Sequence, residues 1–277
     1  MVRTTPLFEP FAESDLLCGA ELHERFARDG YLFVRGALKV EPLLRARKEL
    51  TDVLVAAGLA IESEDGPIWT GADPSGFDRL LMYGPQAELH YLDQAEAAEI
   101  IECLWGAKPL IWRRVGIFLS FPNEDVSDIF PHRDRIVFTD DAKHYATLWV
   151  PLTRIGLQDG GLGIAKGSHR SSVRTVENAA RPAQHVNRPT LKYEDITEPW
   201  CSSPFSPGDA LFFHGRAIHT VTSNAGPRIR IAFALRCQHA DHSPTPMYDL
   251  SLPEFSRRMS AFHALAEVAS RRARERS

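Results

Sequence analysis

The sequence predicts a mainly β fold, a sandwich or barrel, preceded by helices. Apolar residues in the first hundred positions recur with the 3.6-residue period of amphipathic helices. After Pro109 the pattern changes to short apolar segments separated by Pro, Gly, Asn and Asp, as in sandwiches and barrels. The chain has 277 residues, 44% hydrophobic and 25% charged, which is typical of a globular protein. Because β-sandwiches often exceed ~200 residues as one unit, we expect a single domain.

The first predicted helix occupies residues 16–29. Ser14 or Asp15 is placed to cap its N-terminus, and Gly30 is placed to end it in the left-handed conformation that glycine adopts easily. The short apolar run Tyr31–Val34 follows directly and is expected to be a strand.

Two further helices are expected before Pro109, over residues 40–58 and 93–105. The second of the three helices is ended by a glycine, and the third repeats its apolar pattern. The apolar residues at helical spacing in the second helix are Leu43, Leu44, Leu50, Val53 and Leu54.

Five further β segments are predicted after Pro109. They are residues 110–121, 145–152, 161–166, 209–214 and 228–238. Residues 171–200 are polar and irregular, which indicates a long excursion of the kind that often forms a lid or substrate wall. The domain is thus expected to comprise a mostly helical part to about residue 108, a β core over about 109–240, and a C-terminal helix with a basic tail over about 241–277.

Charge and cysteine content restrict the class of function. The 32 Lys and Arg residues against 36 Asp and Glu give a net charge of −4, which would not draw the protein to nucleic acid or an anionic membrane. The four cysteines form no CxxC pair, which argues against a zinc knuckle or a disulfide scaffold. No apolar run has the length of a signal peptide or a membrane span. We expect a cytoplasmic protein with a small-molecule substrate; the sequence does not indicate its oligomeric state.

The segment Phe130-Pro131-His132-Arg133-Asp134 contains a histidine and an aspartate at metal-ligand spacing. In an extended segment, residues two apart project from the same face, so His132 and Asp134 could reach one ion. The tripeptide alone is a weak signal. Two histidines and one carboxylate on one face of a ferrous ion leave three positions open. His219 is the candidate for the third ligand, on a turn between two predicted strands.

The strand after His219 carries Arg230, eleven residues further on. In this strand Arg230 and Arg236 share a face with alanines, and large apolar residues occupy the other face. We expect Arg228 and Arg236 to face solvent from a strand at the edge of its sheet. A buried Arg230 would need an anionic partner, because a guanidinium binds a carboxylate with two hydrogen bonds. A dicarboxylate that chelates the metal at its other end, 2-oxoglutarate, fits this requirement.

These motifs together resemble the phytanoyl-CoA dioxygenase family of Fe(II)/2-oxoglutarate oxygenases, particularly its bacterial members that hydroxylate natural-product intermediates. The resemblance extends over most of the chain. The matching segments are FARDGYLFVRGAL, PHRD, LWVPL, GGLGIAKGSH and PGDALFFH, followed by His219 and Arg230.

The resemblance implies a double-stranded β-helix (jelly-roll) core with N-terminal helices packed on it. It also implies that His132, Asp134 and His219 hold Fe(II), and that O2 and 2-oxoglutarate are consumed with release of succinate and CO2. Arg230 matches the arginine that binds the distal carboxylate of 2-oxoglutarate, and Trp149 matches a residue that lines the same pocket. Because Asp134 occupies the position that is open in related halogenases, hydroxylation is favoured over chlorination, with desaturation or cyclisation as variants.

The chain departs from the family at Val221, two residues after the distal histidine. Many relatives have a small hydroxyl residue there as a second ligand of the distal carboxylate. Thr147 is our preferred substitute, with Thr220 and Thr222 as alternatives. Arg135 stands where some relatives have glycine.

Several arginines are candidates for substrate recognition. Arg113, Arg135 and Arg181 are expected near the site and could bind a carboxylate or phosphate of an anionic substrate, although pairing with the abundant acidic residues explains them equally well. His214 lacks the eleven-residue spacing to Arg230 and is expected to be structural. His169 is expected to hold a turn.

The alternative function is a jelly-roll metal-binding protein that acts as a sensor or a redox-neutral isomerase without 2-oxoglutarate turnover. Arg230 discriminates between the two, because a protein that does not use 2-oxoglutarate has no need for a carboxylate-binding arginine. A nucleic-acid demethylase is disfavoured, since the sequence has no basic patch interleaved with aromatic residues.

Overall fold

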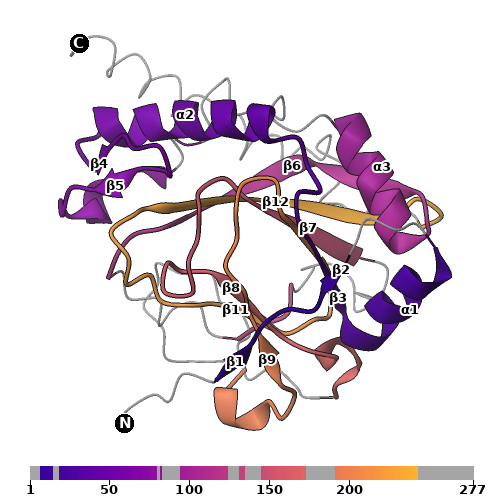
Figure 1. The fold of residues 1–277 in the computed structure, drawn as a ribbon. Coiled ribbons are helices and arrows are strands. Elements are labelled where there is room, and N and C mark those ends of the chain that lie inside the picture. The colour runs from indigo at the N-terminus through magenta and orange to yellow at the C-terminus, as the bar shows by residue number, and fades with distance from the viewer. Residues whose placement is uncertain are drawn as a thin grey trace, which may run out of the picture.

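The described part of the protein contains two large β-sheets, a short separate hairpin, and helices that lie outside one of the two sheets (Figure 1). The computed structural model describes residues 7–14, 19–79, 82, 94–123, 131–134, 145–172 and 191–242. The C-terminal helix and basic tail predicted from about residue 241 lie almost wholly outside these residues.

The larger sheet has six strands. Their order across the sheet is β2 (Glu13–Ser14), β3 (Tyr31–Val34), β10 (Ala210–His214), β7 (Tyr145–Pro151), β12 (Arg230–His239) and β6 (Pro109–Ser120). Every neighbouring pair is antiparallel except β2 and β3. Because β12 is paired on both sides, the edge-strand prediction for Arg236 is wrong.

The smaller sheet has four strands in the order β1 (Phe8–Glu9), β9 (Trp200–Cys201), β8 (Leu162–Ala165) and β11 (His219–Val221). Its last strand begins at His219, which the sequence had placed in a turn. A separate hairpin pairs β4 (Ala60–Ile61) with β5 (Ile68–Trp69).

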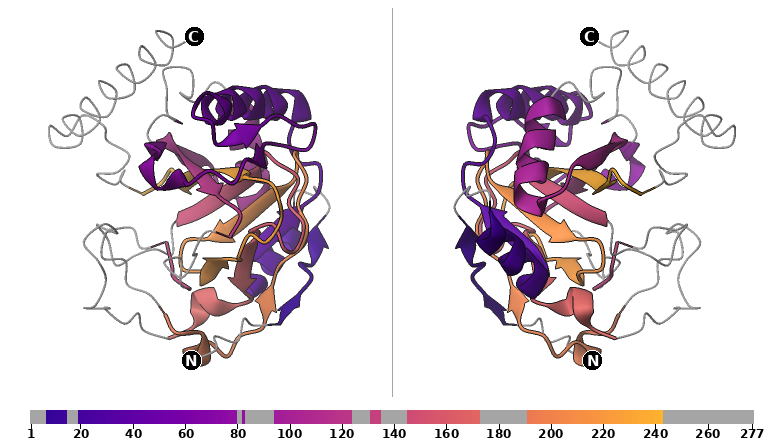
Figure 2. Two further views of the ribbon diagram at one scale, coloured as in Figure 1. Left: turned by 90° about the vertical axis from the view of Figure 1, so that its left-hand side faces the viewer. Right: turned by 90° about the vertical axis from the view of Figure 1, so that its right-hand side faces the viewer.

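Three helices lie on the side of the six-stranded sheet that faces away from the smaller sheet (Figures 1 and 2). They are α1 (Ala20–Asp29), α2 (Val40–Ala56) and α3 (Gln94–Trp105). Gly30 ends α1 with φ of 77° and donates its N–H to Phe26 O at 2.8 Å, as predicted. The predicted start is wrong, because Ser14 belongs to β2 and α1 follows Gly19. Short 3-10 helices are η1 (Pro74–Gly76), η5 (Ser168–Arg170) and η6 (Tyr193–Asp195).

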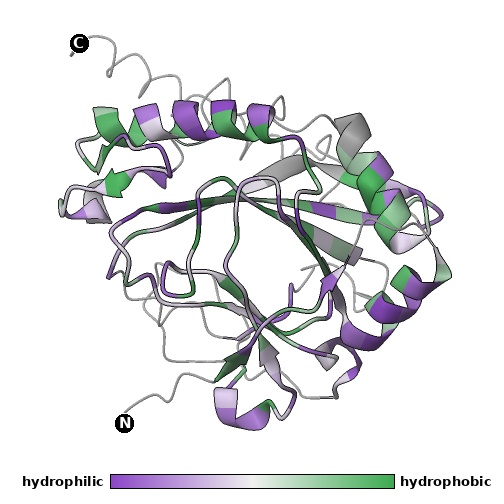
Figure 3. Ribbon diagram, in the orientation of Figure 1, coloured by the Kyte–Doolittle hydropathy of each residue, from purple (hydrophilic) through white to green (hydrophobic). Residues whose placement is uncertain are grey.

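Two layers of apolar side chains pack against the six-stranded sheet, one on each face. The outer layer joins the helices to the sheet and includes Leu43, Leu50 and Leu54 of α2. Leu44 was expected in this layer but is 37% exposed, because the helix turns it toward solvent. Figure 3 shows apolar and polar residues alternating along α2, as this one-sided burial requires. The inner layer lies between the sheets and includes Trp149, Phe205 and Phe213.

The N-terminal part is less separate from the β core than the sequence suggested, because β3 lies inside the six-stranded sheet. Cys201 and Cys237 are buried free thiols, whereas Cys103 in α3 is disulfide-bonded. None of the helices in the described residues is long and apolar enough to cross a membrane.

Candidate active site

The structure brings together the three residues predicted to bind a metal. His132, Asp134 and His219 each offer one ligand atom, and these atoms lie within 4.8 Å of one another. His219 is 6% exposed and the other two residues are half-buried. Among the described residues, His132, Asp134 and His219 form the group of histidine, cysteine or acidic side chains whose ligand atoms are close enough to hold one metal ion.

Main-chain pairing explains why the three side chains converge. His132 N donates to His219 O at 3.0 Å, and His219 N donates to His132 O at 2.9 Å, which forms an antiparallel bridge at the start of β11. Directly opposed residues in such a bridge project from the same face. The two imidazole centroids are therefore only 4.3 Å apart, and Asp134, two residues after His132, reaches the same place.

The hydrogen bond of His219 determines which ring nitrogen faces the cluster. Its Nδ1 lies 3.1 Å from Ala217 O, and because a carbonyl only accepts, Nδ1 is inferred to carry the proton of the neutral ring. The lone pair is then at Nε2, which lies 3.9 Å from Asp134 Oδ1. A histidine anchored in this way is typical of metal sites.

Both oxygens of the Asp134 carboxylate accept hydrogen bonds. Thr147 Oγ1 donates to Oδ2 at 2.8 Å, and Arg236 Nη2 donates to Oδ1 at 3.1 Å. Burial alone would raise the pKa of Asp134, but the charge of the nearby Arg236 guanidinium and its hydrogen bond hold it well below its usual range. The carboxylate is therefore ionised and fixed in orientation.

The positions of Thr147 and Arg236 correct two predictions. The two residues are directly opposed in β7 and β12. Thr147 thus contacts Asp134 rather than lying beside Arg230, where a second ligand of the distal carboxylate would be needed. Arg236, expected at a solvent-facing edge, supports the same carboxylate. A signal for this position of Arg236 is present in the sequence. Arg236 follows Arg230 at an even spacing along the strand, which places both side chains on the same face.

Arg230 is at the other end of the inner face of β12. It is 3% exposed, and its Nε donates to Gly160 O at 3.0 Å while Nη1 contacts Phe118 O at 3.4 Å. Between the two arginines this face carries Ala232 and Ala234, with Trp149 opposite Ala234. Small side chains thus separate the metal-ligand cluster from the buried guanidinium.

The predicted substrate residues are not placed. Arg135 and Arg181, and the side chain of Arg113, lie outside the described part of the chain. Arg133 is described, and it donates to main-chain carbonyls, from Nε to Arg216 O at 2.9 Å and from Nη2 to Ser171 O at 3.0 Å. It links the His-x-Asp segment to the turn at η5.

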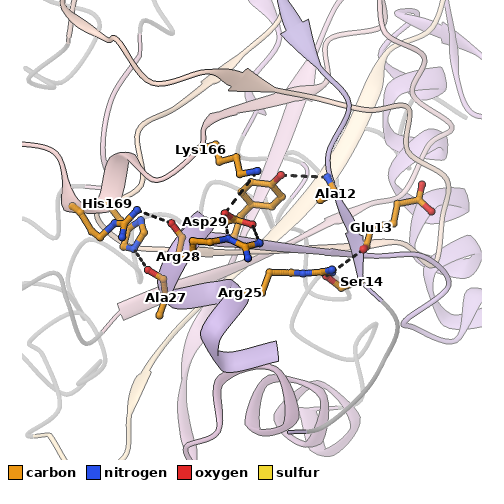
Figure 4. A network of polar contacts seen from close by, with 11 residues as sticks. Ala12, Glu13, Ser14, Arg25, Ala27, Arg28, Asp29, Lys166 and His169 are labelled. Atoms are coloured by element: carbon orange, nitrogen blue, oxygen red, sulfur yellow. Dashed lines mark hydrogen bonds and ion pairs between the residues drawn. The ribbon is translucent and has the colours of Figure 1, made fainter. Parts of the chain in front are cut away.

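The turn that contains His169 is fixed to the end of α1 (Figure 4). His169 Nε2 lies 3.0 Å from Ala27 O, and Gly167 N donates to Asp29 O at 2.7 Å. The Asp29 carboxylate is itself 2% exposed and pairs with Arg28. His169 therefore holds a turn, as predicted. His214 Nδ1 accepts from Arg216 N at 3.0 Å, which agrees with a structural role.

Comparison with known proteins supports the fold and the family. The family model described as phytanoyl-CoA dioxygenase (PhyH) matches residues 26–232, a range that includes the His-Asp-His cluster and Arg230. The 1-deoxypentalenic acid 11-beta-hydroxylase of Streptomyces arenae is 25% identical over 228 residues, covering 79% of this chain and 81% of its own. The enzyme of the same name from Streptomyces exfoliatus is 26% identical over 236 residues, covering 81% and 83%.

A solved structure shares the fold. The non-heme alpha ketoglutarate dependent epimerase SnoN from nogalamycin biosynthesis superposes with a TM-score of 0.54 at 20% identity, covering 82% of this chain and 85% of that one. At this identity the likeness concerns the fold alone. It confirms the predicted mainly β jelly-roll core with flanking helices.

Proposed function

The chain belongs to the phytanoyl-CoA dioxygenase family of Fe(II)/2-oxoglutarate-dependent oxygenases, and we propose that it hydroxylates a small natural-product intermediate at an unactivated C–H bond. The assignment of individual residues to this reaction is part of the proposal.

The main support for this proposed function is the cluster of His132, Asp134 and His219. Two neutral imidazoles and one ionised carboxylate on one side of an ion are the ligand set of non-haem ferrous oxygenases, which leaves positions for cosubstrate and oxygen. The donor set therefore fits Fe(II). The hydrogen bonds that Asp134 accepts and the one that His219 donates support this fit, because they hold the ligand atoms in place before a metal binds.

The remaining residues would hold the cosubstrate and exclude water. The buried Arg230 guanidinium is placed to bind the distal carboxylate of 2-oxoglutarate with paired hydrogen bonds. Trp149 and the alanines of β12 form an apolar wall beside it. When bound, iron with 2-oxoglutarate and O2 supplies the oxidising chemistry that converts the C–H bond to an alcohol and releases succinate and CO2.

For the substrate we propose a small molecule that carries an acidic group. The two relatives are named as hydroxylases of 1-deoxypentalenic acid, and arginines at positions 113, 135 and 181 would supply positive charge for such a group. We place this reaction in the cytoplasm, with neither nucleic acid nor membrane as a partner.

The test is an anaerobic titration of the metal-free protein with Fe(II) and then 2-oxoglutarate. We expect the weak visible charge-transfer band of an iron(II)–2-oxoglutarate chelate in the parent protein. The band should be absent from Asp134→Ala, because the variant lacks the anionic ligand. The control is Asp195→Ala, which removes an exposed carboxylate from η6 and should leave the band unchanged.

Turnover is measured as succinate formed in the presence of candidate acids, with the product detected as one added oxygen by mass spectrometry. A parent protein that binds Fe(II) without ever developing the band would overturn the proposal. The sensor or redox-neutral isomerase would then replace it.

A further inference from the structure

The hydroxyl of Ser120 is buried without a hydrogen-bond partner in the described residues. Ser120 ends β6, is 1% exposed, and its Oγ has no hydrogen-bond partner among the residues that the structure describes. A buried unsatisfied hydroxyl costs roughly 1–3 kcal/mol, so native proteins leave few of them without a ligand, water or strain to explain them.

Ser120 lies directly beside the arginine predicted to bind 2-oxoglutarate. It is the register partner of Arg230 across β6 and β12, so the two side chains project from the same inner face. Gly160 links them, because its carbonyl accepts from Arg230 Nε at 3.0 Å, and a side chain at Gly160 would begin 3.0 Å from Ser120 Oγ. A buried cation and an unpartnered hydroxyl thus adjoin a position that carries no side chain.

The threonine hydroxyls that the sequence suggested for this task are engaged elsewhere. Thr147 donates to Asp134 at 2.8 Å, and Thr222 donates to Gly161 O at 3.2 Å. Thr220 shares a 3.0 Å hydrogen bond with Tyr193. Val221, at the position where many relatives have a hydroxyl, packs against the inner core.

We propose that Ser120 is the second ligand of the distal carboxylate of 2-oxoglutarate, donating its hydroxyl hydrogen while Arg230 binds the same carboxylate. This inference rests on the proposed function. It places the second contact to the distal carboxylate on β6, whereas the sequence analysis expected it next to His219 or on β7. The bound carboxylate would satisfy the orphaned hydroxyl and accept hydrogen bonds from the buried guanidinium at the same time.

Asn224 holds the main chain of this pocket in place. It is 1% exposed, and its Nδ2 donates to Ser120 O at 3.0 Å and to Arg228 O at 2.8 Å. It thereby joins the end of β6 to the segment just before β12. The Ser120 side chain is thus presented from a rigid frame, which reduces the entropic cost of binding.

The experiment compares two 2-oxo acids on Ser120→Ala. Anaerobic Fe(II) protein is titrated with 2-oxoglutarate and with 2-oxopentanoate, which has the same chelating end but no distal carboxylate. We expect the variant to bind 2-oxoglutarate about 10- to 100-fold more weakly than the parent, as for a lost hydrogen bond to a charged group. The affinity for 2-oxopentanoate should stay the same. The matched control is Ser202→Ala, which removes a buried hydroxyl that bonds to Leu162 O in the smaller sheet and should change neither affinity.

Each result has a distinct meaning. Equal binding of 2-oxoglutarate by parent and Ser120→Ala would overturn the assignment of Ser120 and leave the proposed function intact. Equal weakening toward both acids would also overturn it, because the effect would then concern the chelating end or the fold. Absence of a charge-transfer band in the parent would instead contradict the proposed function. Thermal unfolding of the variant shows whether Ser120→Ala remains folded.

Discussion

At the scale of single residues, the candidate site depends on how Asp134 is held. Its two oxygens are fixed by side chains from different strands, Thr147 of β7 and Arg236 of β12. Neither residue is a proposed metal ligand. They act through the carboxylate by fixing its orientation and its charge, which makes them positioning residues.

Thr147→Val should weaken Fe(II) binding by about 10- to 100-fold, which is the range for loss of a contact that orients a metal ligand. The substitution keeps the shape of the side chain but removes the donor to Asp134 Oδ2. Competition with a chromogenic Fe(II) chelator under anaerobic conditions measures the affinity.

Thr147→Ser keeps the hydroxyl and should retain parental affinity, which separates hydrogen bonding from packing. Thr222→Val serves as a control, because its hydroxyl bonds to Gly161 O and not to a proposed ligand. Parental Fe(II) affinity in Thr147→Val would show that this contact does not position Asp134.

At the scale of elements, the end of α1 is joined to the turn at η5. Asp29 accepts from Arg28 Nε at 2.9 Å and from Nη2 at 2.8 Å, and Lys166 Nζ lies 3.8 Å away. Because Arg133 also donates a hydrogen bond to this turn, the turn connects α1 to the His-x-Asp segment. Burial alone would raise the pKa of Asp29, but the hydrogen bonds from Arg28 and the charge of Lys166 lower it.

Asp29→Asn should therefore destabilise the protein most at neutral pH, by about 1–3 kcal/mol. A carboxyl group with a lowered folded-state pKa stabilises the fold fully above its ordinary pKa, and this contribution is lost as the pH falls through the folded value. The difference in unfolding free energy between parent and variant should shrink as the solution is acidified below about pH 4. Urea unfolding at a series of pH values measures it.

Asp52→Asn is the matched control. Asp52 pairs with Lys48 on the exposed face of α2, where an ion pair contributes little, so the variant should stay within about 0.5 kcal/mol of the parent. A difference for Asp29→Asn that does not change with pH would contradict an electrostatic origin.

At the scale of the whole molecule, the site depends on tertiary structure that joins distant parts of the chain. His132 and His219 are 87 positions apart in sequence, yet a main-chain bridge pairs them. Their partner Asp134 is held by strands of the other sheet. A metal bound here would favour the folded state, because the unfolded chain does not bring these ligands together.

Mn(II), a redox-stable probe for the ferrous site, should raise the free energy of unfolding by about 2.7 kcal/mol at a hundredfold excess over its dissociation constant. Urea unfolding with and without Mn(II) measures the rise. Asp134→Ala should lose most of it. An equal rise in that variant would place the metal elsewhere.

The sequence by itself determined the class of fold and the main members of the site. Periodicity predicted the helices and most long strands, and Gly30 marked the end of α1, because local backbone preferences decide these features. His132, Asp134, His219 and Arg230 could be selected from residue type and spacing. The same information could not separate the exposed Leu44 from its buried neighbour Leu43, since both positions fit a helical apolar pattern.

Tertiary structure alone decided which residues meet across strands. Alternation shows which side chains share a face, but strand partners are set by pairings between segments far apart in the chain. For this reason the sequence of the strand is compatible with Arg236 at a solvent-facing edge. Only the position of β12 between β7 and β6 shows that its strand is not at the edge. For the same reason Thr147 was expected at the distal carboxylate, whereas the strand register places it on Asp134 and places Ser120 opposite Arg230.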